Sequence, residues 1–234
     1  MQATTTEELK RRAAEHALTY VESGMALGLG TGSTVAHFVE LLGEALRTGA
    51  LRDIVGVPTS ARTELAARAA GIELIRLGQR AALDLAVDGA DEVSPSLDLI
   101  KGMGGALLRE KMVVQASERF VVIADAGKRV ERLGTLSPLP VEVVEWGMDA
   151  QLRFLRSLGA EAFVRSGSGG EPARSDNGNV FLDCRFAGGI EDPAGLERAL
   201  GQRAGIVETG LFLGLASEAV IAGEDGVEIL RASP

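Results

Sequence analysis

The strongest constraint on the fold is a repeated pattern in which a short apolar run is followed by a turn and a helix-like stretch. Residues 25–29 are such a run, a glycine-rich turn follows, and apolar residues recur at helical spacing over 35–46. The pattern returns as expected strands at 53–57, 72–75, 83–88 and 120–124, with expected helices at 6–20, 60–70 and 106–117. Short strands that alternate with helices predict a parallel sheet with helices on both faces.

The second half of the chain has a different pattern, which begins after Pro138 and Pro140. The expected strands and helices, in chain order, are 141–145, 149–158, 161–165, 180–185, 193–202 and 205–208. An Asn-Gly pair at 177–178, the strongest short hairpin signal, separates the two central strands. The order β-α-β-β-α-β is typical of a ferredoxin-like α+β domain.

Two domains are therefore expected from one chain. The larger α/β domain is predicted over 1–137 and 210–234, and the smaller ferredoxin-like domain over 138–209. Short strand candidates at 211–214, 219–222 and 227–230 are expected to return to the larger domain.

Composition excludes several classes of protein. The chain has 24 basic and 33 acidic side chains, so its net charge of −9 argues against a nucleic-acid partner. A single cysteine and two histidines predict no disulfide and no metal site. No apolar stretch reaches the roughly 18–20 residues that span a bilayer, and the N-terminal residues lack a signal-peptide pattern. The expectation is a cytoplasmic protein that does not bind membranes.

Gly28–Thr34, with the sequence GLGTGST, follows an expected strand and opens an expected helix. Glycines permit close approach of a ligand, and unpaired N–H groups at a helix start suit phosphate. The dinucleotide fingerprint G-x-G-x-x-G is absent because Ser33 is the sixth residue, and Asp53 begins its strand rather than ending it. The segment is either an anion-binding loop or a purely structural turn.

Asp88 ends a buried apolar strand, and Asp91 follows within VDGADE. Ligands of open α/β sheets bind at the carboxyl ends of strands, where two carboxylates can divide acid and base roles. In the alternative interpretation, Asp91 only caps a turn and Glu92 is a solvated surface residue.

Residues 101–111, with the sequence KGMGGALLREK, combine a lysine, three glycines and a helix start. Glu110 could act as a general base, with Lys101 stabilising a developing oxyanion. Alternatively, Glu110 only interacts with the helix dipole. Lys128, after another expected strand, either contacts a ligand phosphate or lies on the surface.

The remaining candidates have simpler interpretations. His16 and His37 are expected to be packing or surface residues, and Trp146 and Cys184 to lie in a core or an interface. Cys184 has no suitable basic partner for a catalytic thiol.

Five motifs together resemble the type A ribose-5-phosphate isomerase family over essentially the whole chain. The motifs are GLGTGST at 28–34, VDGADE at 87–92, KGMGGALLREK at 101–111, IADAGK at 123–128 and DNGN at 176–179. The resemblance implies a Rossmann-like domain with a smaller ferredoxin-like domain, a homodimer or homotetramer, and no metal or organic cofactor. It implies interconversion of D-ribose 5-phosphate and D-ribulose 5-phosphate, in the non-oxidative pentose phosphate pathway.

The resemblance also assigns roles to residues. It implies that Glu110 moves a proton between C1 and C2, that Asp88 assists opening of the sugar ring, and that Asp91 and Lys101 bind hydroxyl and cis-enediolate oxygens. The implied substrate contacts are Lys10, Thr31, Gly32, Ser33, Thr34, Asp88, Gly89, Ala90, Asp91, Lys101, Gly102, Met103, Gly104 and Lys128.

Two residues depart from the family pattern. Met103 stands where some relatives have Gly or Arg, and its side chain is expected to point away from the sugar. Leu108 stands where the family often has Thr.

Other functions predict other residues. A sugar-phosphate deaminase or a CoA-transferase-like enzyme would lack the VDGADE and KGMGG…REK segments in combination. A non-catalytic sugar-phosphate sensor would not need Asp88, Asp91, Lys101 and Glu110 together. A nucleotide-dependent dehydrogenase would need the missing dinucleotide fingerprint.

Overall fold

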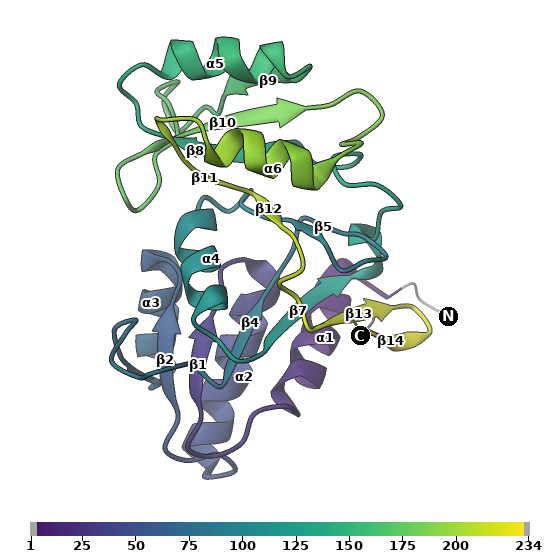
Figure 1. Ribbon diagram of the computed structural model, residues 1–234. Coiled ribbons are helices and arrows are strands. Elements are labelled where there is room, and N and C mark those ends of the chain that lie inside the picture. The colour runs from purple at the N-terminus through teal and green to yellow at the C-terminus, as the bar shows by residue number, and fades with distance from the viewer. Residues whose placement is uncertain (1–3, 232–234) are drawn as a thin grey trace. The chain divides into compact units, whose positions relative to one another are not determined.

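The computed structural model describes residues 4–231, and these form two compact units (Figure 1). Unit 1 contains the chain up to Ala90, residues 109–128 and the chain from Leu215 onward, whereas unit 2 contains 91–108 and 129–214. These units group 91–108, 129–137 and 210–214 with the small domain, although the sequence-based border places them in the larger one. Residues 1–3, part of the segment that lacks a signal-peptide pattern, lie outside the described range.

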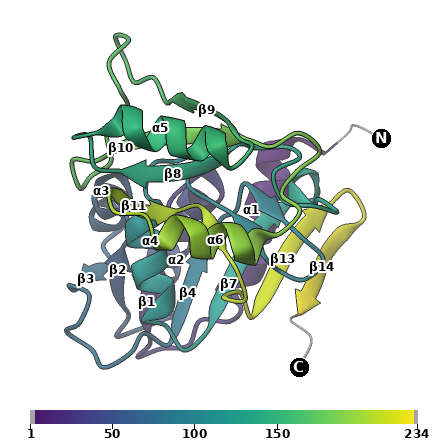
Figure 2. The same ribbon diagram turned by 45° about the horizontal axis from the view of Figure 1, so that its top comes forward.

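Unit 1 is built on a seven-stranded sheet with the order β14-β13-β7-β4-β1-β2-β3. Every pairing in it is parallel except that of the β13–β14 hairpin, which forms one edge of the sheet (Figure 2). The strands are β1 (Ala26–Leu29), β2 (Val55–Pro58), β3 (Glu73–Leu74), β4 (Leu85–Asp88), β7 (Phe120–Asp125), β13 (Glu218–Gly223) and β14 (Gly226–Arg231). The predicted mostly parallel α/β sheet is confirmed.

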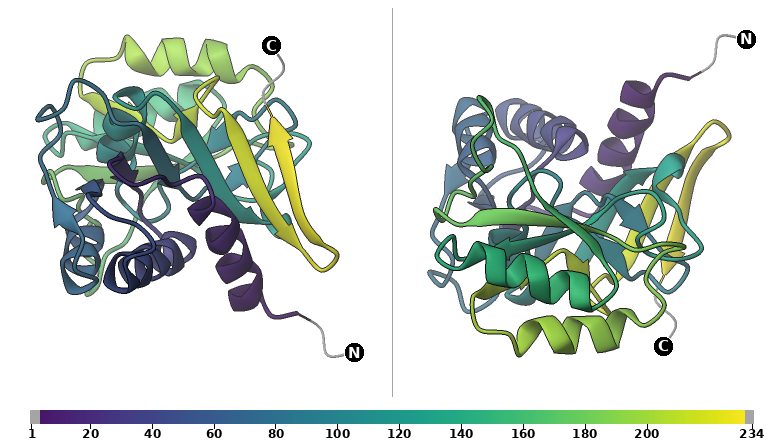
Figure 3. Two further views of the ribbon diagram at one scale, coloured as in Figure 1. Left: turned by 90° about the horizontal axis from the view of Figure 1, so that it is seen from below. Right: turned by 90° about the horizontal axis from the view of Figure 1, so that it is seen from above.

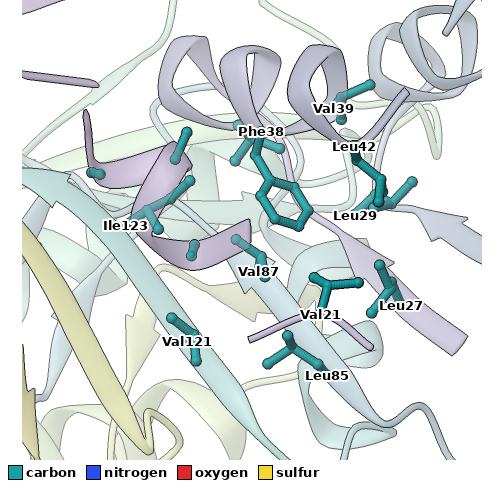
Figure 4. Packing of buried hydrophobic residues seen from close by; sticks show 14 of the residues in the cluster. Val21, Leu27, Leu29, Phe38, Val39, Leu42, Leu85, Val87, Val121 and Ile123 are labelled. Atoms are coloured by element: carbon teal, nitrogen blue, oxygen red, sulfur yellow. The ribbon is translucent and has the colours of Figure 1, made fainter. Parts of the chain in front are cut away.

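Helices cover both faces of this sheet. Their bounds are α1 (Thr6–Leu18), α2 (Ser33–Thr48), α3 (Ala61–Ala69) and α4 (Leu107–Gln115), of which the residues from Arg109 onward belong to unit 1. Helices α1, α2 and α3 pack on one face around Phe38 (Figures 3 and 4). Successive strand residues face opposite sides, so Leu27 joins this core whereas Ala26 packs with Val113 of α4 on the other face.

The ends of several elements differ from those expected. Helix α1 is capped by Thr5 rather than Thr6, because Thr5 and Glu8 form a reciprocal capping box. The strand expected at 53–57 begins at Val55, since Asp53 adopts a left-handed backbone conformation with φ 59°. Within residues 4–231, no helix is both long and apolar enough to cross a membrane.

Unit 2 contains a four-stranded antiparallel sheet with the order β11-β8-β10-β9. Its elements are β8 (Leu139–Val143), α5 (Met148–Ser157), β9 (Glu161–Val164), β10 (Val180–Arg185), α6 (Pro193–Gly201) and β11 (Ile206–Thr209). Leu155 of α5 and Leu200 of α6 pack in one core against the same face of the sheet (Figure 3). The ferredoxin-like arrangement predicted from the sequence is confirmed.

A second, three-stranded sheet in unit 2 was not expected. Its strands are β5 (Glu92–Val93), β6 (Leu99–Ile100) and β12 (Leu211–Phe212), in the order β12-β6-β5. Strand β12 was expected to return to the larger domain, but it pairs with β6. Each strand has only two residues, which is too short for an alternation of apolar and polar residues to be recognised.

Candidate active site

Several predicted site residues of unit 1 lie at the carboxyl edge of the large sheet. Strands β7, β4 and β1 are neighbours and parallel, so their carboxyl ends share this edge. Strand β1 leads into the turn at 30–32, β4 ends on Asp88, and β7 is followed by the short helix η1 (Ala126–Lys128). The fold therefore places Asp88 between the glycine-rich turn and the segment that carries Lys128.

The three glycines of the 28–34 segment are each required for a different structural reason. A Cβ atom at Gly28 would overlap Val113, so this glycine permits the close packing of α4 on β1. A Cβ atom at Gly30 would overlap the Asp88 carboxyl group. Gly32 has open space around it but a φ of 135°, which side chains rarely adopt. The sequence left open an anion-binding loop or a structural turn, and the structure shows that two of these glycines accommodate the protein's own side chains.

The Asp88 carboxylate is buried, with 2% of the residue exposed. Its Oδ1 accepts hydrogen bonds from the backbone N–H groups of Thr31 (3.0 Å) and Gly89 (2.7 Å). Charge-assisted bonds of this kind fix the orientation of a carboxylate. Asp88 is thus rigidly connected to the glycine-rich turn.

The Thr31 side chain belongs to a buried cluster of four hydroxyl groups. Its Oγ1 lies 2.7 Å from Oγ1 of Thr59, 2.8 Å from Oγ of Ser60 and 3.1 Å from Oγ1 of Thr63. Thr63 also donates to the carbonyl oxygen of Gly30 (2.7 Å). Because a hydroxyl has one donor and two acceptor positions, these contacts use the capacity of the Thr31 hydroxyl. The cluster connects the start of α3 to the turn, and sequence reasoning missed it.

Glu110 lies in the first turn of α4 and is also buried, with 2% exposed. At the other end of this helix, Ala116 accepts a hydrogen bond from Leu83, which precedes β4. The end of α4 therefore lies near the amino edge of the sheet, and its first turn lies toward the carboxyl edge. Unit 1 consequently holds two buried carboxylates, Asp88 and Glu110, toward one edge of its sheet.

Lys10 on α1 forms an ion pair with Glu7 at 2.6 Å. The same carboxylate lies 3.1 Å from Nε2 of His37 on α2. The hydrogen bond from Lys10, and then that from His37, lowers the pKa of Glu7. Exposed Glu7 thus connects a predicted substrate-binding lysine to the helix that begins at the glycine-rich turn.

Unit 2 carries the other predicted residues, in a glycine loop formed by residues 101–105. Lys101 is 2% exposed, and its Nζ lies 5.4 Å from the centre of the Phe212 ring. The Met103 N–H donates to Oδ2 of Asp91 (3.0 Å). Gly102 has a φ of 106°, a conformation that explains the glycine at this position. Asp91 and the loop that follows Lys101 are thereby joined within one unit.

Two buried carboxylates of unit 2 have structural partners that the sequence did not reveal. Glu92, which the alternative interpretation placed in solvent, is fully buried and accepts three backbone N–H bonds of 2.6 Å. Glu142 on β8 is also fully buried and accepts from Ser175 (2.7 Å) and Asn179 (2.8 Å). The DNGN motif at 176–179 is therefore a turn connected to Glu142.

The remaining sequence candidates do not form a reactive centre. Burial raises the pKa of the Cys184 thiol to about 12, and the neighbouring Asp183 contributes. Trp146 is 91% exposed, so it is not a core residue. His16 contacts Tyr20, with 3.3 Å between Nε2 and the phenol oxygen. Among residues 4–231, no three His, Cys, Asp or Glu side chains form a group that could hold a metal.

Comparison with known proteins identifies the family. A family model described as Ribose 5-phosphate isomerase A (phosphoriboisomerase A) matches residues 55–226. The chain belongs to the ribose-5-phosphate isomerase A family. Its members named Ribose-5-phosphate isomerase A include one from Roseiflexus castenholzii, 55% identical over 93% of each chain. Another, from Desulfatibacillum aliphaticivorans, is 46% identical over 98% of this chain and 100% of the relative.

A solved structure of the ribose-5-phosphate isomerase family has the same fold. It has a TM-score of 0.95 and 41% identity, with 97% of this chain and 100% of that chain covered. That structure is described as D-ribose-5-phosphate isomerase in complex with phospho-erythronic acid. The family resemblance inferred from the five motifs is confirmed, and the chain is accordingly an enzyme, a ribose-5-phosphate isomerase.

Proposed function

We propose that this isomerase interconverts D-ribose 5-phosphate and D-ribulose 5-phosphate by proton transfer through a cis-enediolate. The observation that carries the mechanism is the pair of buried carboxylates, Asp88 and Glu110, in one unit with the glycine-rich start of α2. Proton transfer next to a carbonyl needs a base, and the charge that develops needs stabilisation. The family resemblance assigns the first role to Glu110 and the second to Lys101.

Glu110 acts as the base in this mechanism. Its carboxylate removes the proton on C2 of the open-chain aldose, the electron pair of that C–H bond forms the C1–C2 double bond, and the carbonyl electron pair moves to O1 to give the enediolate. Transfer of the hydroxyl proton from O2 to O1, with return of the abstracted proton to C1 and formation of the C2 carbonyl, gives the ketose. Lys101 stabilises the negative charge on the enediolate oxygens, since one well-placed donor can contribute roughly 3–4 kcal/mol.

Asp88 and Asp91 interact with the hydroxyl groups of the sugar. Asp88 assists opening of the furanose ring, which requires proton movement between the C1 hydroxyl and the ring oxygen. Its two backbone hydrogen bonds keep the carboxylate in a fixed orientation for this step. Asp91, which accepts a hydrogen bond from the Met103 N–H of the glycine loop, binds sugar hydroxyls.

The phosphate group binds at the start of α2, together with Lys10 and Lys128. This helix begins after Gly32, and no side chain caps its first turn. Unpaired N–H groups and the positive end of the helix dipole favour an anion there. Ser33 and Thr34 add hydroxyl donors, whereas Thr31 contributes by shaping the turn, because its hydroxyl belongs to the buried cluster.

The ligand named with the related structure fits this mechanism chemically. Phospho-erythronic acid combines a phosphate with a carboxylate, whose two oxygens and negative charge resemble those of an enediolate. We therefore expect 4-phosphoerythronate to inhibit this chain in competition with ribose 5-phosphate.

The rest of the proposal follows the sequence-based expectations. The reaction uses no metal or organic cofactor, takes place in the cytoplasm, and belongs to the non-oxidative pentose phosphate pathway. The active protein is a homodimer or homotetramer, which sedimentation analysis can distinguish.

Proton NMR of the protein with ribose 5-phosphate in D₂O, with and without excess EDTA, tests the reaction. We expect ribulose 5-phosphate with deuterium at C1, unaffected by EDTA. Glu110→Gln should lower kcat by about 10²–10⁴-fold, whereas the exposed Glu118→Gln should retain wild-type kcat. Near wild-type turnover by Glu110→Gln would rule out this residue as the base.

A further inference from the structure

Arg165, directly after β9, uses every hydrogen-bond donor of its side chain within unit 2. Nε and Nη2 donate to the two carboxylate oxygens of Asp183, at 2.9 and 2.5 Å. Nη1 donates to the carbonyl oxygens of Gly102 (2.9 Å) and Met103 (3.3 Å), and Nη2 lies 3.7 Å from the Met103 sulfur. An arginine has five N–H donors, so all five have acceptors, three of them in the glycine loop.

The partners of Arg165 are themselves firmly placed. The Asp183 side chain is 5% exposed and lies within β10, the central neighbour of β9. The guanidinium carbon of Arg165 lies 4.8 Å from the centre of the buried Phe181 ring. The backbone N–H of Arg165 donates to the backbone carbonyl of Phe181 at 2.9 Å. The guanidinium plane is fixed by two hydrogen bonds to the buried Asp183 carboxylate and by its contact with the Phe181 ring. The sheet therefore presents three N–H donors in a defined orientation to the glycine loop.

One peptide group connects Arg165 to Asp91. The Gly102 carbonyl accepts from Arg165, and the N–H of the same peptide, which belongs to Met103, donates to Oδ2 of Asp91. In a trans peptide the C=O and N–H lie in the peptide plane and point in opposite directions, so the two contacts lie at opposite edges of that plane. The orientation of this plane consequently determines where the Asp91 carboxylate is held.

We propose that Arg165 is a positioning residue of the isomerase, which fixes the 101–105 loop and through it Asp91 and Lys101. This inference rests on the proposed function, in which these two residues bind the sugar and the enediolate. Arg165 itself acts only through the loop. The loop is also held by hydrogen bonds from the Lys101 N–H to the Gly210 carbonyl (2.9 Å) and from the Gly105 N–H to the Gly102 carbonyl (3.1 Å). Three of its five residues are glycines, whose backbone has the most freedom to move when a side-chain contact is lost.

The Met103 side chain belongs to the same arrangement. Its sulfur lies beside Nη2 of Arg165, and the residue is 42% exposed. The departure from the family pattern at this position thus adds one acceptor to Arg165. It leaves the carbonyl contacts of the loop in place.

The test compares Arg165→Ala and Arg165→Lys with wild type, in turnover of ribose 5-phosphate and in thermal unfolding. Misplacement by about 1 Å can lower a rate by about 10²-fold, so we expect kcat to fall by roughly 10–100-fold. KM should rise less than kcat falls, because the phosphate-binding groups of unit 1 are untouched whereas Asp91 loses part of its hold on the sugar. Lysine retains the charge but lacks the planar fork, so Arg165→Lys should not restore kcat.

Arg174→Ala is the matched control. Arg174 also joins a backbone carbonyl, that of Gly178, to a carboxylate, that of Glu145, but on an exposed turn. It should therefore retain wild-type kcat. A kcat of Arg165→Ala within about twofold of wild type, or equal losses in Arg174→Ala and Arg165→Ala, would overturn the proposal. Restoration of kcat by Arg165→Lys would also overturn it.

A second measurement does not depend on activity. The chain has five methionines, and the Met103 methyl signal in a ¹³C-methyl NMR spectrum can be assigned with Met103→Leu. Arg165→Ala should shift or broaden this signal, and Arg174→Ala should leave it unchanged. If the wild-type protein does not turn over ribose 5-phosphate, the proposed function is refuted. The Met103 signal would then show separately whether Arg165 orders the loop. An unchanged Met103 signal in Arg165→Ala would show that Arg165 does not fix the 101–105 loop and would overturn the proposal.

Discussion

Single residues of this protein determine where its reactive carboxylates can lie. Gly30 is the clearest case, because any side chain there would overlap the Asp88 carboxyl group. Asp88 in turn accepts two backbone hydrogen bonds that keep it beside the glycine-rich turn. A residue with no side chain thus fixes the position of one that acts on substrate in the proposed mechanism.

Gly30→Ala should lower kcat by at least about 10-fold, since the new methyl group must displace Asp88. Gly30 does not require a left-handed backbone, so the overlap is the only defect introduced. Gly201→Ala in α6 is the control, because its Cβ would meet open space in a helix. It should keep wild-type kcat and gain about 0.4–1 kcal/mol of stability, because alanine restricts the unfolded chain. Equal kcat values in the two variants would show that Asp88 tolerates the methyl group.

At the scale of elements, the long helices and strands follow from sequence pattern, whereas the short ones do not. Helix α2 and strand β10 have enough residues to show their periodicity, and both were predicted. Strands β5, β6 and β12 have two residues each, and β12 lies far along the chain from its partner β6.

For the candidate site, the sequence indicated residues that lie in motifs but not residues that contact them from elsewhere in the fold. Sequence motifs indicated Asp88, Asp91, Lys101 and Glu110, because carboxylates and lysine beside glycine-rich turns suggest chemistry. Arg165 had no such signal, since its acceptors on the glycine loop lie 62 and 63 residues away in the sequence. Contacts of this kind depend on the tertiary fold and leave no local pattern.

The segment before β8 depends on Glu92 of β5, which accepts from the backbone N–H groups of Gly134, Leu136 and Ser137. Glu92→Gln replaces one acceptor oxygen by an NH₂ group. This group then faces one N–H donor if it replaces Oε2, or two if it replaces Oε1. The free energy of unfolding should fall by about 2–3 kcal/mol, as measured by urea unfolding with an unchanged m-value. The exposed Glu171→Gln should have almost no effect. A loss below about 0.5 kcal/mol in Glu92→Gln would contradict a structural role for this carboxylate.

At the scale of the whole molecule, a polar cluster joins the β13–β14 hairpin to two segments from earlier in the sequence of unit 1. Glu218 on β13 contacts Tyr20 after α1 (3.3 Å), Arg231 on β14 (3.6 Å) and Arg119 before β7. The Arg119 guanidinium also lies 4.4 Å from the centre of the Tyr20 ring. Elements from the two ends of the sequence therefore meet in one set of contacts.

Partial burial, and then the charge of Glu218, raises the pKa of Tyr20. A raised pKa means that the folded state favours the protonated phenol. The stability from this group is therefore present below pH 10 and is lost as the pH rises through the higher value. Tyr20 is the only tyrosine, so an absorbance titration of phenolate reports on it alone. The native protein should ionise at higher pH than the urea-unfolded protein, and coincident curves would contradict this.

The position of β13 in the sheet also affects how the protein is made. Strand β13 pairs with β7, yet residues 129–214 lie between them in the sequence. During translation the apolar strand β7 therefore emerges from the ribosome long before its partner, with one edge unpaired. Exposed strand edges promote aggregation, so this edge needs protection in the nascent chain until unit 2 has been synthesised.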